Sequence, residues 1–221
     1  MKLSGAVFDF DGTLFDTMSV WDTAGEDYLR LCGKTPRENL CEALKAMSLS
    51  GAARYLKENY DLPLSVNEIV DGVNKTVADF YLYKAQPKSG IREFLAELCS
   101  LNVRMCITTA AEHKLTEGAL KRCGLFGFFD KIFTCEEVGH DKNDPYIYFE
   151  ALSFLGTEKD ETLVFEDAYH AAKTAKEAGF TVAAVYDSHE KSPEKMKFVS
   201  DIYLNDFLHP NEFINDIKNI K

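Results

Sequence analysis

Two acidic residues, Asp9 and Asp11, flank one aromatic residue directly after a short apolar run near the N-terminus. Burying such acids without a partner is costly, and residues two apart in a strand point to the same side. We therefore expect both carboxylates to share one pocket at the carboxyl edge of a sheet, where a divalent cation would relieve their repulsion. The alternative is an Asp-Gly turn at Gly12, in which the acids only cap or solvate the loop.

Further polar residues stand where later apolar runs end or where a helix begins. They are Thr109 and Ala110 after residues 103–107, Lys142 shortly before Pro145, and Glu166 and Asp167 after residues 163–165. Taken singly, they can be a strand-end threonine, a surface lysine and acids at a helix N-terminus. Open α/β sheets, however, bind ligands at the carboxyl ends of their strands. One shared site is therefore favoured over independent coincidences.

The elements that would position these residues follow from the hydrophobic pattern. Short apolar runs alternate with helical periodicity over most of the chain. The runs are residues 6–8, 103–107, 131–133, 163–165, 181–185 and 202–204. This alternation predicts an α/β fold with a doubly wound, mainly parallel sheet. Residues 17–84 instead indicate successive helices, so we expect a core domain of residues 1–16 and 85–221 and an inserted all-α domain of residues 17–84.

Residues 8–17 (FDFDGTLFDT) resemble the first motif of the haloacid dehalogenase-like superfamily, whose core is Rossmann-like. Residues 103–110, 139–148 and 163–167 resemble its second, third and fourth motifs. The superfamily places a helical cap directly after the first motif, where this chain has its helical insertion. The resemblance covers nearly the whole chain and is to the phosphoglycolate phosphatase and β-phosphoglucomutase-like group.

The resemblance implies a role for each polar residue. Asp9 would be the nucleophile that takes the phosphoryl group as an aspartyl phosphate. Asp11 would be the general acid and base. These different roles require that the environments of Asp9 and Asp11 give their carboxyl groups different pKa values. Thr109 and Ala110 would hold a phosphate oxygen, and Lys142 would neutralise Asp9 and the transferring oxygens.

Mg²⁺ is the cofactor that the resemblance implies. Its ligands would be Asp9, the backbone carbonyl of Asp11, and Asp167, with Glu166 as a direct or water-mediated contact. An acid at position 11 also disfavours cleavage of carbon–halogen or carbon–phosphorus bonds, because related enzymes of those types typically lack it. The expected enzyme is a phosphatase of a small phosphate monoester such as a sugar phosphate, a phosphoglycolate-like acid or a nucleotide.

The insertion offers evidence on the reaction type. Residues 44–50 (LKAMSLS) fall where β-phosphoglucomutase has a loop that contacts its sugar phosphate, and Leu49 stands where that loop has arginine. Losing this cation favours a hydrolase over a mutase, although Lys45 remains as a candidate substrate-binding residue or a solvated helix residue. A β-phosphoglucomutase-like mutase is the runner-up, and a catalytically silent binding protein of the same fold is the third hypothesis.

Large side chains of the insertion are expected in its core rather than at substrate. They are Trp21, Tyr28, Met47 and Tyr81.

Charge and composition restrict the partners. Acidic residues outnumber basic ones by 36 to 25, which gives a net charge of −11 and argues against binding to nucleic acid or an anionic membrane. Asp9 interrupts the N-terminal apolar run, so we expect neither a signal peptide nor a membrane span and place the protein in the cytoplasm. The six cysteines are expected to be reduced and mostly buried. The expected partner is a small phosphorylated metabolite, and a monomer is the default.

Overall fold

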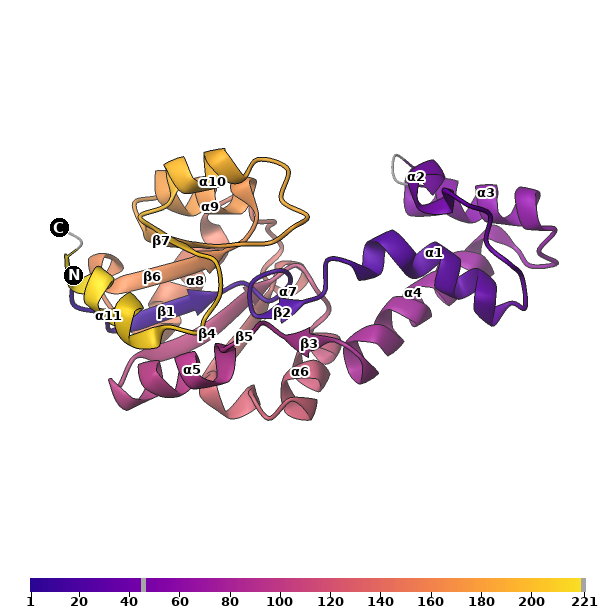
Figure 1. The fold of residues 1–221 in the computed structure, drawn as a ribbon. Coiled ribbons are helices and arrows are strands. Elements are labelled where there is room, and N and C mark those ends of the chain that lie inside the picture. Colours follow the sequence, from indigo (N-terminus) through magenta and orange to yellow (C-terminus); the bar gives the residue numbers. More distant parts are fainter. Residues whose placement is uncertain (45–46, 220–221) are drawn as a thin grey trace. The chain divides into compact units, whose positions relative to one another are not determined.

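The computed structural model describes residues 1–44 and 47–219. The chain divides into two compact units, one of Met1–Thr17 with Ala85–Lys221 and one of Met18–Lys84 (Figure 1). The sequence placed the corresponding boundaries after residues 16 and 84.

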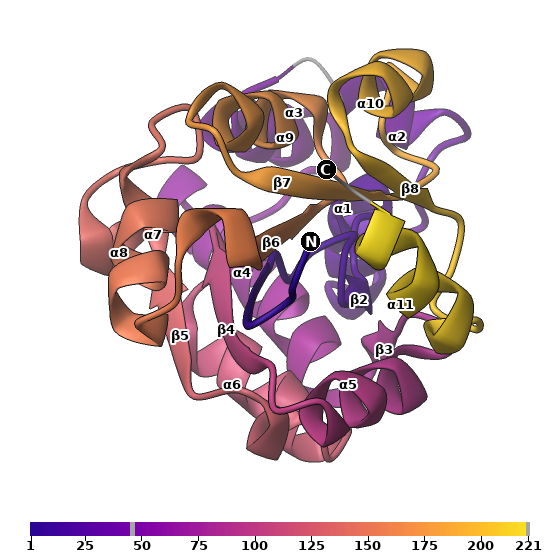
Figure 2. The same ribbon diagram turned by 90° about the vertical axis from the view of Figure 1, so that its left-hand side faces the viewer.

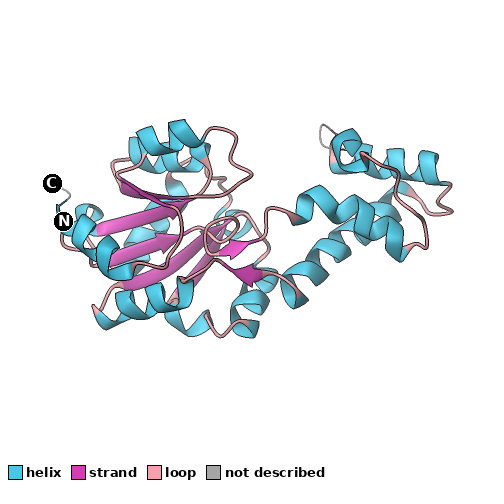
Figure 3. Cartoon of the chain, in the orientation of Figure 1, coloured by secondary structure: helices cyan, strands magenta, loops and turns pink. Residues whose placement is uncertain are grey.

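A parallel sheet of six strands forms the centre of the first unit within the described residues (Figure 3). Its strands, in spatial order, are β5 (Lys131–Thr134), β4 (Arg104–Thr109), β1 (Gly5–Phe8), β6 (Thr162–Glu166), β7 (Thr181–Val185) and β8 (Ile202–Leu204). Every neighbouring pair is parallel. Each of the six apolar runs forms one of these strands, so the predicted doubly wound, mainly parallel α/β fold is confirmed.

Helices cover both faces of this sheet, as Figure 2 shows. They are α5 (Ile91–Ser100), α6 (His113–Arg122), α7 (Cys135–Val138), α8 (Tyr146–Leu155), α9 (Tyr169–Glu177), α10 (Pro193–Val199) and α11 (Pro210–Asn219). Side chains alternate between the two faces of the sheet along its central strands, so each face has its own part of the core. Val7 and Val164 pack with α8, α9 and α10, whereas Phe8 stacks on Phe165 with ring centroids 4.1 Å apart. Phe94 of α5 contacts Phe165 on that second face.

A short antiparallel ribbon in the same unit joins β2 (Phe15–Asp16) to β3 (Gln86–Pro87). Each strand has only two residues, too few to show an alternating pattern in the sequence. The ribbon pairs the two chain segments that border residues 18–84, and the Lys88 N–H donates to the Leu14 carbonyl beside it. The ribbon therefore fixes the backbone at the end of the first motif.

The second unit contains helices α1 (Val20–Leu31), α2 (Leu40–Leu44), α3 (Leu49–Tyr60) and α4 (Val66–Tyr83). A capping box starts α4, because the Ser65 hydroxyl accepts from the Glu68 N–H and the Glu68 carboxylate accepts from the Ser65 N–H. Tyr28 and Tyr81 are buried, as predicted.

The core predictions for two other side chains of this unit were wrong. Trp21 is 54% exposed and Met47 is 39% exposed. Trp21 lies in the first turn of α1, and both side chains line a cavity of about 370 Å³ within the helical unit. They therefore border open space instead of being fully packed.

Two further expectations concern the membrane and the cysteines. Among the described residues, no helix is both long enough and apolar enough to cross a membrane. No disulfide joins the cysteines, which all lie in the described residues; Cys106 is buried, Cys99 is exposed and the others are intermediate. The cysteines are therefore less buried than the sequence predicted, because several lie near helix ends rather than in strands.

One buried hydroxyl in the sheet lacks a hydrogen bond. Thr108 of β4 is fully buried, and its Oγ1 has no partner among the described residues. Replacing Thr108 with Val keeps the shape and removes the unpaired group, so the free energy of unfolding is expected to rise by about 1 kcal/mol. Urea unfolding measures this change. A destabilised Thr108→Val protein would show that the hydroxyl has a partner in solution.

Candidate active site

The strand order brings the predicted polar residues to one edge of the sheet. Asp9 directly follows β1, and its N–H donates to the Phe165 carbonyl at 2.9 Å, which fixes its backbone beside β6. Thr109 is the last residue of β4, and Glu166 is the last residue of β6. Because β4, β1 and β6 are parallel neighbours, these side chains start from the same carboxyl edge.

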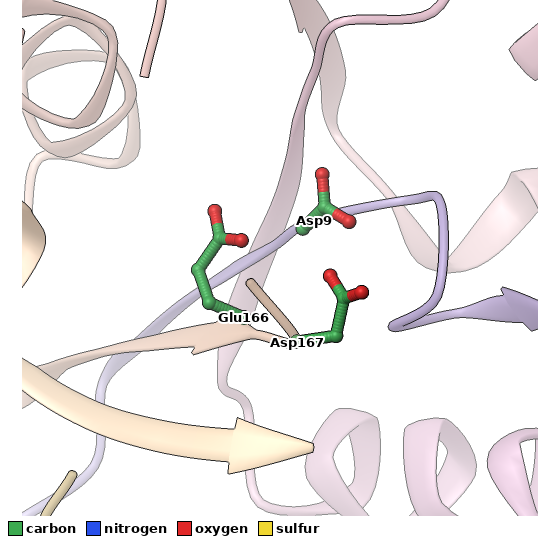
Figure 4. Close-up of side chains that lie close together, drawn as sticks. All are labelled: Asp9, Glu166 and Asp167. Carbon is green, nitrogen blue, oxygen red and sulfur yellow. The ribbon is translucent and has the colours of Figure 1, made fainter. Parts of the chain in front are cut away.

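Three carboxylates gather at this edge. Oxygens of Asp9, Glu166 and Asp167 all lie within 4.8 Å of one another, and all three residues are buried (Figure 4). Such proximity is unfavourable for three anions unless cations or protons compensate them. A cluster of hard oxygen donors suits a hard divalent cation, so the residues present fit the metal that the sequence implied.

Lys142 supplies one positive charge to the cluster. Its Nζ donates to Asp9 Oδ1 and to Glu166 Oε1, the latter at 2.8 Å, and the residue is 7% exposed. Burial alone would lower the pKa of this ammonium group, but the charges of Asp9 and Glu166 outweigh burial and raise its pKa above the ordinary value. The lysine is therefore charged at neutral pH.

One lysine does not neutralise three carboxylates. Burial raises the pKa of Glu166 to about 7, although the charge of Lys142 opposes this rise. Burial also raises the pKa of Asp167 well above its usual range, and the charges of Asp9 and Glu166 add to the shift. Without a cation, the cluster therefore favours proton uptake near neutral pH.

Asp11 is placed differently from Asp9. Strand β1 ends at Phe8, so the alternation of a strand does not extend to Asp11. Its carboxylate Oδ1 accepts a hydrogen bond from the Thr17 hydroxyl at 2.6 Å, and it is outside the three-carboxylate cluster found among the described residues. Thr13 belongs to the same loop, and its hydroxyl donates a hydrogen bond to Asp167 Oδ1 at 3.3 Å.

Of the remaining predicted site residues, the structure describes Thr109 and Ala110 but not Lys45. Thr109 is fully buried, and its Oγ1 accepts from the Ala111 N–H at 3.0 Å. Ala110 is exposed at the strand end. Lys45 lies outside the described residues.

The ion pair between Lys88 and Asp187 was not predicted from the sequence. The Asp187 side chain is 1% exposed, and its Oδ2 accepts from Lys88 Nζ at 2.7 Å. Burial would raise the pKa of Asp187, but hydrogen bonds from Lys88 and from the His189 N–H lower it. Asp187 also contributes to the raised pKa of Asp167. It follows β7 by two residues, so the strand-end pattern used for the other acids could have found it.

The contact of Tyr148 with the site was also not predicted from the sequence. It is fully buried on α8, and its hydroxyl donates to Glu166 Oε1 at 2.8 Å. Its position on an apolar helix face gave no signal of a polar contact.

An open parallel sheet with buried acids and a lysine at its carboxyl edge defines a Rossmann-like α/β protein with a site suited to a metal and an anion. Comparison with known families shows which family the chain belongs to. Residues 6–185 match the model of the haloacid dehalogenase-like hydrolases. The chain therefore belongs to this family, and the predicted membership is confirmed.

Individual relatives agree with this assignment. The chain is 28% identical over 210 residues to a Drosophila melanogaster protein named probable pseudouridine-5'-phosphatase, covering 91% of this chain and 90% of that protein. It is 24% identical over 177 residues to the phosphorylated carbohydrates phosphatase of Thermotoga maritima, covering 80% and 82%. The predicted enzyme class, a phosphatase of this family, is confirmed.

A solved structure shows the same fold. It is that of a candidate β-phosphoglucomutase from Thermotoga maritima, which matches with a TM-score of 0.84 and 21% identity. The match covers 97% of this chain and 99% of that one.

Proposed function

We propose that this protein is a Mg²⁺-dependent phosphatase that hydrolyses a small phosphate monoester through an aspartyl phosphate on Asp9. The observation that carries the proposal is the buried cluster of Asp9, Glu166 and Asp167 with Lys142 bonded to both Asp9 and Glu166. This arrangement supplies a nucleophilic oxygen, a cation beside it and oxygen ligands for a metal, which are the parts that phosphoryl transfer needs.

The metal would be held by Asp9, Asp167 and the backbone carbonyl of Asp11, with Glu166 in direct or water-mediated contact. When bound, Mg²⁺ would neutralise the carboxylates and polarise the phosphoryl oxygens. The raised pKa values of Glu166 and Asp167 support this assignment, because burial, together with the charge of Asp9, disfavours their ionised forms, and a bound cation would favour those forms.

In the first step, an Asp9 carboxylate oxygen attacks phosphorus, and the bond from phosphorus to the ester oxygen breaks. Asp11 gives its proton to that leaving oxygen. In the second step, the ionised Asp11 takes a proton from water, the water oxygen bonds to phosphorus, and the bond from phosphorus to Asp9 breaks. Lys142 and Thr109, with the backbone at Ala110, hold the phosphoryl oxygens throughout.

The substrate that we propose is a small phosphorylated metabolite. Named relatives include a probable pseudouridine-5'-phosphatase, a phosphorylated carbohydrates phosphatase and a fructose-1-phosphate phosphatase, which all act on small phosphorylated compounds. We also propose that residues 17–84 are a cap that excludes water from the reaction and contributes specificity contacts.

Hydrolysis is favoured over a mutase reaction because Leu49 stands where the sugar-phosphate-contacting loop of β-phosphoglucomutase has arginine. A mutase must hold a second phosphate, and an apolar side chain at this position cannot pair with one. Isomerised sugar phosphate appearing faster than free phosphate would favour the mutase instead.

The experiment that tests the proposal is release of p-nitrophenol from p-nitrophenyl phosphate, with Mg²⁺ and with a chelator. We expect activity that requires Mg²⁺, followed by a screen of phosphorylated metabolites to find the substrate. Absence of any Mg²⁺-dependent phosphate release across the screen would reject the proposed function.

Asp11→Asn tests the division of roles between the two aspartates. The variant is expected to lower kcat by about 100- to 10,000-fold, because Asn can neither give nor take the proton. The Mg²⁺ dissociation constant is expected to stay near that of the wild type, since the metal contact at this residue is a backbone carbonyl. Rapid-quench kinetics and calorimetry measure the two quantities. Unaltered turnover would remove Asp11 from the proton transfers.

A further inference from the structure

Tyr148 has a polar contact that its packing does not require. Its ring packs beside Phe180 with centroids 6.2 Å apart, in a core where a phenylalanine would fit equally well. Its hydroxyl nevertheless reaches Glu166 Oε1 at 2.8 Å. The other acceptor in reach, the Ala171 carbonyl, is 3.5 Å away. A phenol has one proton to donate, so the shorter contact, to the Glu166 oxygen, takes it.

This hydroxyl and Lys142 bind the same oxygen of Glu166. Lys142 Nζ donates to Oε1 at 2.8 Å, and the same ammonium group donates to Asp9 Oδ1. A continuous chain of contacts therefore runs from Tyr148 through Glu166 and Lys142 to Asp9. Two donors on one oxygen fix the rotation of the carboxylate. In the described part of the chain, no donor hydrogen-bonds to Oε2, which leaves that oxygen for the metal or one of its waters.

We propose that Tyr148 is a positioning residue for the Mg²⁺-dependent reaction, because its hydroxyl fixes the Glu166 carboxylate between Lys142 and the cation site. This inference rests on the proposed function. Without the hydroxyl, Lys142 is the remaining donor to the Glu166 carboxylate among the described residues, and the carboxylate can rotate. Such outer contacts of a metal site commonly contribute strongly to metal affinity or activity.

Tyr148→Phe tests the proposal because it removes only the hydroxyl. We expect its Mg²⁺ affinity, measured by calorimetry with the metal alone, to fall by about 10- to 100-fold, with little change in KM. Tyr60→Phe is the matched control. Tyr60 is also buried, and its hydroxyl accepts from the Arg37 N–H at 2.9 Å in the helical unit, so its loss should leave metal affinity and kcat unchanged.

A double-mutant cycle with Glu166→Gln separates positioning from packing. If Tyr148 acts through the Glu166 carboxylate, Tyr148→Phe should have almost no further effect on Mg²⁺ affinity in the Glu166→Gln background. Equal effects on Mg²⁺ affinity in both backgrounds, or wild-type Mg²⁺ affinity in Tyr148→Phe, would overturn the proposal. If the wild type binds Mg²⁺ but releases no phosphate from any ester, the proposed function fails, and the calorimetric cycle still decides the role of Tyr148.

Discussion

Asp9→Asn is expected to lower Mg²⁺-dependent phosphate release by at least about 1,000-fold, because loss of a covalent nucleophile removes the first step of the reaction. The amide also removes the negative charge of a side chain that accepts a hydrogen bond from Lys142 Nζ and that would bind the metal. Initial rates with p-nitrophenyl phosphate, together with circular dichroism to show that the variant is folded, measure this effect.

Asp130→Asn is the matched control for this variant. Asp130 is exposed at the amino end of β5 and pairs with Arg104, at the end of the sheet opposite to the candidate site. Its turnover should equal that of the wild type. A folded Asp9→Asn enzyme with more than a tenth of the wild-type rate would mean that another group attacks phosphorus.

Lys142→Met is expected to have the second largest effect, on both stability and activity. The change leaves Asp9 and Glu166 buried without their shared cation, and breaking a buried ion pair costs about 3–5 kcal/mol. Urea unfolding in a chelator should show this loss. Added Mg²⁺ should restore part of the stability, because a ligand that binds only the native state stabilises it. Turnover should remain low, since a charge beside the transferring oxygens is missing.

Lys173→Met provides the control. Lys173 is a half-exposed residue of α9 whose ion pair with Glu177 lies on the surface, so its loss should change the free energy of unfolding by less than about 1 kcal/mol. If Lys142→Met is as stable as Lys173→Met without metal, the buried contacts of Lys142 do not stabilise the site.

The strands were predictable because their signal is local. Runs such as residues 163–165 are apolar over consecutive positions, and a strand buried on both faces needs no more than that. The gathering of Asp9, Glu166 and Asp167 followed from placing polar residues at strand ends in a parallel sheet. The role of Lys142 came from its resemblance to a family motif, and its contacts with two of these acids are consistent with that role.

The features that were missed depend on contacts between distant segments. Lys88 and Asp187 are 99 residues apart, and neither sequence neighbourhood indicates the other. The Tyr148 hydroxyl contacts Glu166 because α8 packs against the sheet and places Tyr148 beside the carboxyl end of β6. The strand alternation applied to Asp11 failed because β1 ends at Phe8, and the length of a strand is set by its neighbours as well as by its own residues.

The role proposed for Asp9 is to carry the phosphoryl group during turnover. The most direct measurement is to quench the wild-type enzyme in acid while it hydrolyses p-nitrophenyl phosphate with Mg²⁺, and then to reduce the protein with borohydride. An aspartyl phosphate is reduced to the alcohol, so mass spectrometry of the peptide that contains Asp9 should find homoserine at position 9. Reduction at a different residue, with Asp9 intact, would contradict the account.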